Sequence, residues 1–437
     1  MRFVFASVAA FWVSILIAGS ACAQDTTVDT TAFAEIERRI EALTLEIEEL
    51  RLGSDVVARA DTSMLGLGPA ASKVYGIQQG VSIGGYGEFL YENFSESRDD
   101  GAPSGISDRS DALRGVIYVG YKFDDRFLFN SEIELEHAST GQAGEVSLEF
   151  AYLDYRLTPQ FGLRAGLLLS PMGFVNELHE PPIFLGARRS ETESRIIPTT
   201  WSETGLGIFG QTDALAYRVY LMSSLDGVGG GSSGASGFGA FGLRGGRQKG
   251  SKAIAESFSV VGRLDWMGGL GFTTGSSLYA GDSGHGQALP DGTPVDVRTV
   301  IWEGHAQYRL RGLEVSGLLA VAGVDDATAL NELKGLTGSE SVAERLWGGY
   351  LELGFDVLGA RSTTHRLIPF VRYEALDTQS RVPDGFNPDP ASGVTIVTLG
   401  ISWKPLPQIV GKLDYQRIDN DALSGVDQMN LALGYLF

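Results

Sequence analysis

Hydrophobic and polar residues alternate along most of the chain beyond residue 80. Phe127, Phe129 and Ile133 fall on one side of such a stretch, whereas Asn130 and Glu132 fall on the other. This period of two predicts β-strands that each have one apolar and one polar face. The alternation predicts about 16 strands, at residues 81–94, 111–123, 126–137, 145–157, 161–170, 200–210, 215–223, 257–267, 272–280, 296–310, 313–323, 346–356, 366–375, 393–403, 408–418 and 426–437.

Short and long connections follow one another between these strands. Arg311-Gly312 is a short connection, and residues 224–256 form a long one that is rich in glycine and serine. A soluble β-sandwich would also have alternating strands, with the apolar faces in a core. Short turns at one end, long loops at the other and aromatic residues near strand ends are instead typical of outer-membrane barrels. The sequence therefore predicts an all-β fold, a transmembrane antiparallel β-barrel over residues 81–437, with an aqueous lumen.

The last predicted strand finishes at Tyr435-Leu436-Phe437. A terminal aromatic residue on an alternating strand resembles the assembly signal of outer-membrane barrels. We therefore expect Tyr435 and Phe437 to be the signal that the barrel-assembly machinery reads.

The first 80 residues lack this alternation. Residues 1–23 have a positive start, an apolar run and small residues at the end, which predicts a cleaved secretory signal peptide. In residues 24–52, apolar residues are spaced by three and four, which predicts a periplasmic coiled-coil helix that associates with copies of itself. An amphipathic helix packed on its own domain is the alternative. Residues 53–80 contain glycine and proline and are predicted to be a linker.

Composition restricts the class of function. The 437 residues have a formal net charge of −20, which argues against nucleic acid as a partner. One cysteine and five histidines leave little material for a metal site, and no cofactor is expected. The segment Gly205-Leu206-Gly207-Ile208-Phe209-Gly210 matches a nucleotide-binding pattern, but no helix follows it, so glycines of a barrel strand are the simpler interpretation. We therefore expect no enzymatic activity.

Several segments together resemble a family of bacterial channels. They are Gly84-Gly85-Tyr86-Gly87-Glu88, Glu132–Ala138, Asn176–Pro182, Ile196–Trp201 and Gly246-Arg247-Gln248-Lys249. These segments resemble bacterial outer-membrane porins of the phosphate-selective porin O and P superfamily. The resemblance implies a trimeric barrel of sixteen strands whose third external loop folds into the lumen. It also implies stacked arginines and a lysine cluster in the phosphate-selective members, whereas this chain is acidic and poor in lysine.

The third long loop, residues 171–199, is the expected narrowing of the pore. Its charged residues are the constriction candidates, namely Arg188, Arg189, Arg195, Glu177, Glu180, Glu191 and Glu193. On the strands, the lumen-wall candidates are Arg164, Glu132, Glu134, Glu136, Arg372 and Glu374.

All charges on the predicted inward faces amount to eight cations and nine anions, which is close to balance. Two hypotheses follow from this balance. Separation of the two signs across the constriction would set up a transverse field that orders dipolar solutes. Alternatively, loop charges pair with wall charges and only hold the loop in place.

The sequence therefore predicts an outer-membrane porin for passive diffusion of small hydrophilic solutes or ions, with weak charge selectivity set by the third loop. An anion- or phosphate-selective channel is the first alternative. A plugged barrel that acts as a surface receptor or an outer-membrane enzyme is the second. The expected partners are outer-membrane lipid and lipopolysaccharide, further copies in a homotrimer, the barrel-assembly machinery and, through the N-terminal helix, the cell wall.

Overall fold

The computed structural model describes residues 38–39, 63–138, 144–359, 361 and 363–437. The chain divides into two units, Met1–Gly53 and Ser54–Phe437. In the first unit the described residues are Arg38 and Arg39, which are helical and exposed. The predicted signal peptide and the rest of the predicted coiled coil therefore lie outside the described residues. Within the described part of the chain, no helix has both the length and the apolar character needed to cross a membrane.

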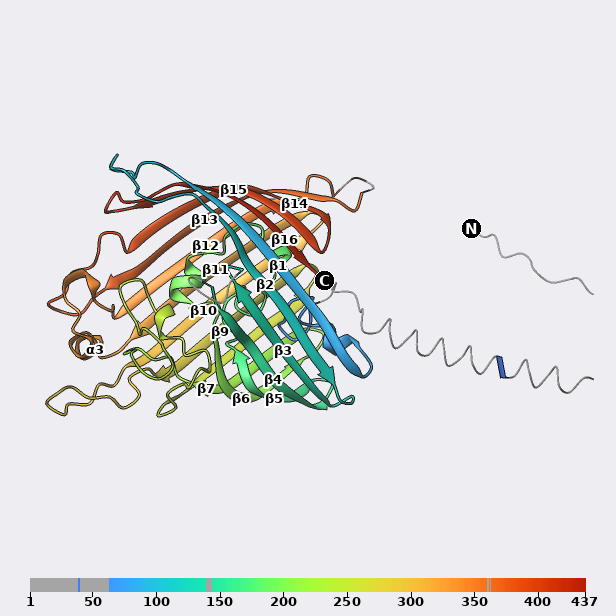
Figure 1. Ribbon diagram of the computed structural model, residues 1–437, viewed down its shortest axis with the longest axis horizontal. Coiled ribbons are helices and arrows are strands. Elements are labelled where there is room, and N and C mark those ends of the chain that lie inside the picture. Colours follow the sequence, from blue (N-terminus) through green and yellow to red (C-terminus); the bar gives the residue numbers. More distant parts are fainter. Residues whose placement is uncertain (1–37, 40–62, 139–143, 360, 362) are drawn as a thin grey trace, which may run out of the picture. The chain divides into compact units, whose positions relative to one another are not determined.

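Sixteen antiparallel strands close into one barrel in the second unit (Figure 1), and each strand pairs with its neighbours in the sequence. The last strand returns to the first, so the sheet has no free edge. This architecture confirms the predicted fold class. The strands are β1 (Gly80–Phe94), β2 (Arg109–Lys122), β3 (Phe127–Glu136), β4 (Val146–Thr158), β5 (Phe161–Leu169), β6 (Ser202–Gln211), β7 (Leu215–Ser223), β8 (Phe258–Gly269), β9 (Phe272–Asp282), β10 (Arg298–Leu310), β11 (Leu313–Val324), β12 (Arg345–Phe355), β13 (Arg366–Arg381), β14 (Gly393–Leu406), β15 (Ile409–Asn420) and β16 (Gln428–Leu436).

Side chains alternate between the two faces of the wall as predicted. In β16, Leu431 and Leu433 on the outer face are 54% and 49% exposed, whereas Gln428 and Asn430 on the inner face are buried. A strand directs successive side chains to opposite faces, so one strand can serve an apolar exterior and a polar interior together. The exterior is accordingly an apolar surface of the kind that a barrel presents to lipid.

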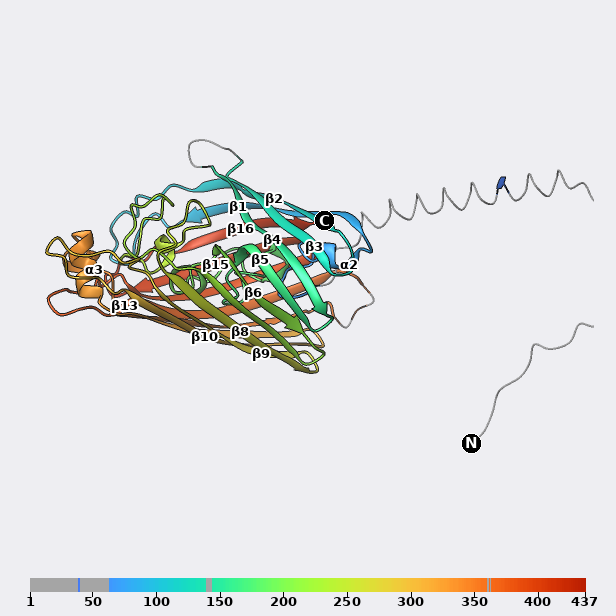
Figure 2. The same cartoon turned by 90° about the horizontal axis from the view of Figure 1, so that it is seen from below.

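The two ends of the barrel differ in their connections. The short-turn end carries tight connections such as residues 159–160 and 311–312, together with the C-terminus and helix α2 (Lys73–Gly76) (Figure 2). The long-loop end carries the longer connections and helix α3 (Ala327–Lys334). The connection from β5 to β6, residues 170–201, is the third long loop in chain order, and we call it L3.

The barrel interior is partly filled, and one of the two segments that fill it was predicted to be a linker. A hydrophobic core joins residues of L3, such as Met172 and Ile197, to inward-facing aromatic residues of the wall, such as Tyr118 and Phe150. Residues of the segment Ser63–Gln79, which we call the inner segment, belong to the same core. Glycine and proline predict a break in regular structure there, but they do not indicate whether the segment is buried or exposed.

Gly85 lies at the seam where β16 meets β1. Its backbone forms two hydrogen bonds with Phe437, of 3.0 and 2.9 Å. A Cβ atom on Gly85 would lie 2.3 Å from the carbonyl oxygen of Val116 and 2.7 Å from the ring of Phe437. We expect Gly85→Val to destabilise the closed barrel by roughly 1–3 kcal/mol, as overpacking does. The lower stability should appear as unfolding at a lower temperature on semi-native SDS gels.

Gly115→Val on β2 is the matched control, because no atom lies within 4 Å of a Cβ atom at Gly115. If the two variants unfolded at the same temperature, the close approach at Gly85 would not be what stabilises the seam.

Candidate functional site

L3 turns into the barrel between β5 and β6 and contains two short helical turns, η1 (Pro181–Ile183) and η2 (Thr192–Ile196). Its two ends are held together by Asn176. The side-chain amide of Asn176 donates to the carbonyl oxygens of Ser170 at 2.6 Å and Trp201 at 2.9 Å. Its Oδ1 accepts the backbone N–H of Trp201 at 2.7 Å. One buried side chain therefore closes the neck of the loop, and the residues between these ends extend into the lumen.

Charged side chains of the opposite wall bind the backbone of L3. Asp414 of β15 accepts the N–H of Ala187 at 2.6 Å, and Glu374 of β13 accepts the N–H of Thr192 at 2.6 Å. Unpaired backbone groups inside a barrel are costly, so these wall charges stabilise the inserted loop. Cations donate to L3 carbonyl oxygens in the same way: Lys412 to Gly186, Lys404 to Pro182, Arg309 to Ile183 and Arg372 to Arg188.

Two acidic candidates of L3 also fix the loop. Glu177 forms a salt bridge of 3.0 Å with Arg218 of β7. Glu193 accepts the N–H of Val175 at 2.8 Å and the hydroxyl of Tyr350 at 2.7 Å. Burial raises the pKa of both carboxyls above the ordinary value. Both side chains therefore contribute to the position of the loop.

The arginine candidates of L3 differ in their partners. Arg188 forms a salt bridge with Glu92 of β1, and Arg195 pairs with Glu191 within the loop at 2.7 Å. Arg189 takes part in none of the salt bridges among the described residues, and its guanidinium donates to a backbone carbonyl oxygen of L3 at 3.3 Å. Arg189 is therefore the candidate with the most available charge.

The wall candidates all lie on inward faces, and several are paired. Arg164 of β5 forms two hydrogen bonds with Asp154, of 2.7 and 2.9 Å. Glu132 of β3 binds the imidazole of His179 in L3 at 2.9 Å. Glu136 lies at the end of the same strand and is partly exposed. These positions follow the parity that the sequence predicted.

The remaining wall candidates form looser pairs. Glu134 lies 3.4 Å from Arg114 of β2. Arg372 of β13 lies 3.6 Å from Glu352 and 4.0 Å from Glu374. The interior charges of both signs therefore neutralise one another across neighbouring strands.

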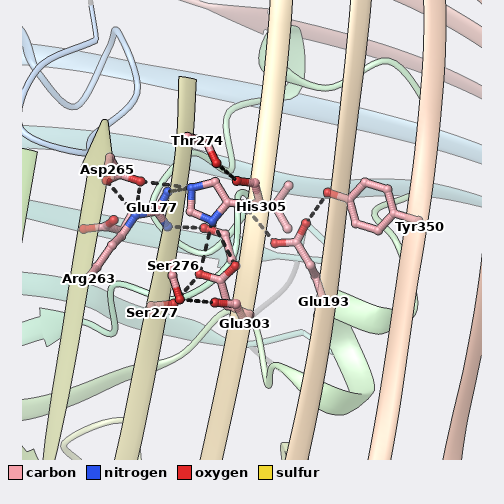
Figure 3. Close-up of polar contacts among 12 residues, drawn as sticks. Glu177, Glu193, Arg263, Asp265, Thr274, Ser276, Ser277, Glu303, His305 and Tyr350 are labelled. Carbon is pink, nitrogen blue, oxygen red and sulfur yellow. Dashed lines mark hydrogen bonds and ion pairs between the residues drawn. The ribbon is translucent and has the colours of Figure 1, made fainter. Parts of the chain in front are cut away.

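A polar cluster on β8 and β10 contacts the inner part of L3 (Figure 3). The imidazole of His305 lies between two carboxylates, with Nε2 2.9 Å from Asp265 and Nδ1 2.9 Å from Glu303. Arg263 donates to Asp265 at 2.8 Å and also to the carbonyl oxygen of Gly173 in L3. The cluster thus joins the loop to the wall through alternating charges. Among the described residues, no group of three or more His, Cys, Asp and Glu has the arrangement of a metal site.

Cavities lie on both sides of L3. A cavity of 470 Å³ at the short-turn side is lined by the inner segment, L3 and β7–β12, including Glu177. At the long-loop side, cavities of 300 and 340 Å³ share Arg188, Arg189 and Glu191. Phe184 of L3 lines both the 470 and the 300 Å³ cavities and therefore lies between the two sides.

Some predicted candidates do not line these cavities, and some lining residues were not predicted. Glu180 and Glu193 line none of the three, whereas Arg195 lines the 340 Å³ cavity. Phe184, whose ring centroid lies 3.6 Å from Nζ of a wall lysine, and Arg244 of the β7–β8 loop were not among the candidates. The constriction candidates are charged residues of one loop, so they do not include an aromatic residue or a cation from another loop.

Glu180 binds the inner segment and lines none of these three cavities. Its Oε1 accepts the N–H of Ala70 and the N–H of Ala71, both at 3.0 Å. Burial raises the pKa of Glu180 from 4.5 to about 7, and the two N–H donors oppose this rise only in part. Between these two pH values the folded protein holds a proton that the unfolded chain has lost, so stability falls as pH rises through this range.

We expect the contribution of Glu180 to the stability of the folded barrel to be largest below about pH 4.5 and to fall up to about pH 7. Glu180→Gln stays neutral and keeps an acceptor oxygen, so it should remove this dependence. The temperature of unfolding on semi-native SDS gels, compared between wild type and variant across this pH range, measures the effect. The same pH dependence in both proteins would exclude Glu180 as its source.

Solved barrels of outer-membrane proteins are similar to this chain in structure. Salmonella typhi OmpF, solved in complex with daunomycin, has a TM-score of 0.53 and 12% sequence identity over 82% of this chain and 98% of its own. The outer membrane channel DcaP of Acinetobacter baumannii has a TM-score of 0.50 and 11% identity over 82% of this chain and 97% of its own. At such low identity the likeness shows a common fold.

No protein-family model matches the chain. A protein of Aquifex aeolicus (strain VF5), described as uncharacterized, is 38% identical to it over 390 residues, which cover 87% of this chain and 86% of the other. Identity of this extent over most of both chains indicates common descent. The chain belongs to the same family as this Aquifex aeolicus protein, and its barrel has the fold of bacterial outer-membrane porins.

Proposed function

We propose that this protein is an outer-membrane porin through which small hydrophilic solutes or ions diffuse passively. The observation that carries the proposal is a closed barrel with an apolar exterior and with cavities, each lined in part by charged residues, on both sides of an inserted loop. Such a barrel leaves no strand edge unpaired in lipid, and its lumen offers an aqueous route. In this proposal the long-loop end faces the cell exterior and the short-turn end faces the periplasm.

One of the segments that resemble the phosphate-selective porin O and P superfamily, Asn176–Pro182, helps to hold L3 in position inside the barrel. Asn176 closes the neck of the loop, and His179 binds Glu132 of the wall at 2.9 Å. These contacts support membership of that superfamily at the level of architecture. They concern the position of the loop and not the recognition of phosphate.

Weak charge selectivity follows from the extensive pairing of lumen charges. Arg189 and Arg244 both line the 300 Å³ cavity, and neither takes part in a salt bridge among the described residues. Burial lowers the pKa of Arg189, and the nearby Arg114 adds to this effect. We therefore assign a modest preference for anions, or for the anionic end of a dipolar solute, to this cavity.

A plugged barrel that serves as a surface receptor is the second candidate, and the hydrophobic core inside the barrel favours it. An enzyme of the serine-hydrolase type is not favoured by the polar cluster of Figure 3. In that cluster Ser277 donates to Glu303 and His305 is held between two carboxylates, so no hydroxyl is paired with the imidazole.

Planar-bilayer recordings of the full-length mature protein distinguish the two candidates. A porin gives stable open steps whose size scales with salt concentration, and a plugged receptor gives none. An inert sixteen-stranded porin with an open lumen, reconstituted by the same method, controls for insertion.

The assembly and the remaining partners belong to the same proposal. We propose a homotrimer whose N-terminal helices, residues 24–52, associate in the periplasm or contact the cell wall after residues 1–23 are removed. Residues 53–80 then lead into the barrel of residues 81–437, which contacts lipid and lipopolysaccharide. Tyr435 and Phe437, both exposed on the outer face, are suited to recognition by the barrel-assembly machinery.

Removing the unpaired cations of the long-loop side should change the ion preference. We expect Arg189→Gln with Arg244→Gln to lower the anion-to-cation permeability ratio about two- to tenfold, because local charge sets the local ion concentration. Reversal potentials in a salt gradient measure this ratio.

Arg417→Gln is the matched control, because Arg417 is 65% exposed, pairs with Asp419 at 3.0 Å and lines none of these cavities. An unchanged reversal potential in the double variant, with normal conductance, would place Arg189 and Arg244 outside the solute path.

A further inference from the structure

The inner segment lies against the lumen face of the first strands at the short-turn end. Leu67 and Val74 are each 1% exposed. Val74 packs over Gly120 of β2: a Cβ atom on Gly120 would lie 2.6 Å from a methyl carbon of Val74. Asn130 of β3 donates to the carbonyl oxygen of Ala71 at 2.9 Å. Apolar and polar contacts therefore both hold the segment inside the barrel.

Tyr75 of α2 anchors the segment to β4 and β5. Its hydroxyl donates to Asp154 at 2.8 Å, accepts from Arg164 at 2.8 Å and lies 3.0 Å from the hydroxyl of Tyr152. Buried polar groups are costly when a partner is missing, so this network specifies one position for α2.

The segment is also attached to L3. Glu180 of the loop accepts the N–H groups of Ala70 and Ala71. A Cβ atom on Gly66 would lie 2.9 Å from the carboxylate of Glu177 and 2.9 Å from the guanidinium of Arg218. The segment is therefore held between the wall on one side and the loop on the other.

The free side of the segment lines the lumen. Ser63, Leu65, Gly66 and Pro69 line the 470 Å³ cavity, which is bounded elsewhere by L3, mainly by wall residues of β7–β12, and also by Gln211, Pro407 and Leu436. Solute that crosses the barrel through this cavity meets a surface that precedes β1 in the chain and is separate from L3.

We infer that the inner segment is a second pore-narrowing element, which sets the width of the solute path at the short-turn end and confines solute to the β7–β12 side. The inference rests on the proposed porin function and adds a determinant of pore size that precedes β1 in the chain and is distinct from the loop. It assigns to residues 63–79 a role in the size cut-off of the channel.

The test releases the segment in the full-length mature protein. Val74→Asp with Tyr75→Ala removes the packing on β2 and the hydroxyl network, while Asp154 and Arg164 remain paired with each other. We expect single-channel conductance to rise about twofold or more, because the cross-section of a pore limits its conductance. The size cut-off for neutral polyethylene glycols should rise with it. Tyr75→Phe, which loses only the hydroxyl contacts, should show a smaller increase and serves if the double variant does not fold.

Gln79→Ala is the matched control, because Gln79 lies in the same segment but is exposed and donates to the carbonyl oxygen of Phe123. Its conductance should equal that of the wild type.

Cysteine accessibility reports the position of the segment separately from conductance. The chain has one cysteine, Cys22, which lies in the predicted signal peptide. Ser72 is 2% exposed, so Ser72→Cys should react slowly with a hydrophilic thiol reagent and Gln79→Cys quickly. In the release variant Ser72→Cys should also react quickly.

The outcomes separate the inference from the function on which it rests. A conducting wild type whose release variant exposes Ser72→Cys but keeps the same conductance and size cut-off overturns the inference alone. Silence of both wild type and release variant overturns the porin function and the inference together. Open steps in the release variant next to a silent wild type would make the segment a complete plug, and its limiting role would stand.

Discussion

Backbone hydrogen bonding determines this structure, because a strand in lipid has no partner other than another strand. The requirement is met only if the first and the last strand pair. β1 and β16 do so, from the pair Tyr86–Leu436 to the pair Phe94–Gln428. Gly85 accommodates this closure, since its missing side chain leaves room for the ring of Phe437. Once the barrel is closed, alternation along each strand assigns every second side chain to the exterior. The polar interior is then a consequence of the closed wall.

The same requirement applies to the chain inside the barrel. L3 and the inner segment bring backbone N–H and C=O groups into the lumen, and there they are paired by inward-facing charges such as Asp414, Glu374 and Lys412. This explains why cations and anions are nearly balanced on the inward faces, since both donors and acceptors of the backbone need partners. Of the two hypotheses for these charges, pairing that holds the loop therefore accounts for most of them. In the proposed porin, selection among ions would be left to the few charges that form no ion pair, such as Arg189.

The alternation of the sequence predicted the wall closely because a period of two leaves little freedom. The predicted strand at residues 313–323 corresponds to β11 (Leu313–Val324), and the charged residues of β3 face inward as predicted. β13 runs to Arg381, whereas the predicted strand ends at residue 375. The pairing of β13 with β12 shifts register beyond Asp377, and regular alternation is lost in this last part of the strand, so the sequence pattern did not indicate it. The sequence could not predict the interior contacts in the same way. Glu180 and Ala70 are 110 residues apart, and no periodicity connects an irregular loop with an irregular segment before the first strand.

The partly filled lumen gives a physical reason for the position of the narrowing. The aromatic residues Tyr118, Phe150 and Tyr152 face inward on β2–β4, where water would contact apolar rings unless other apolar groups covered them. L3 and the inner segment cover them, so one side of the lumen is packed and the remaining path lies on the other side. Packed and hydrogen-bonded groups hold this path at a constant width, and Phe184 lies between the cavities at its two ends. In the proposed porin, discrimination by size therefore depends on the packing that fills the barrel, and discrimination by charge depends on the few cations that form no ion pair.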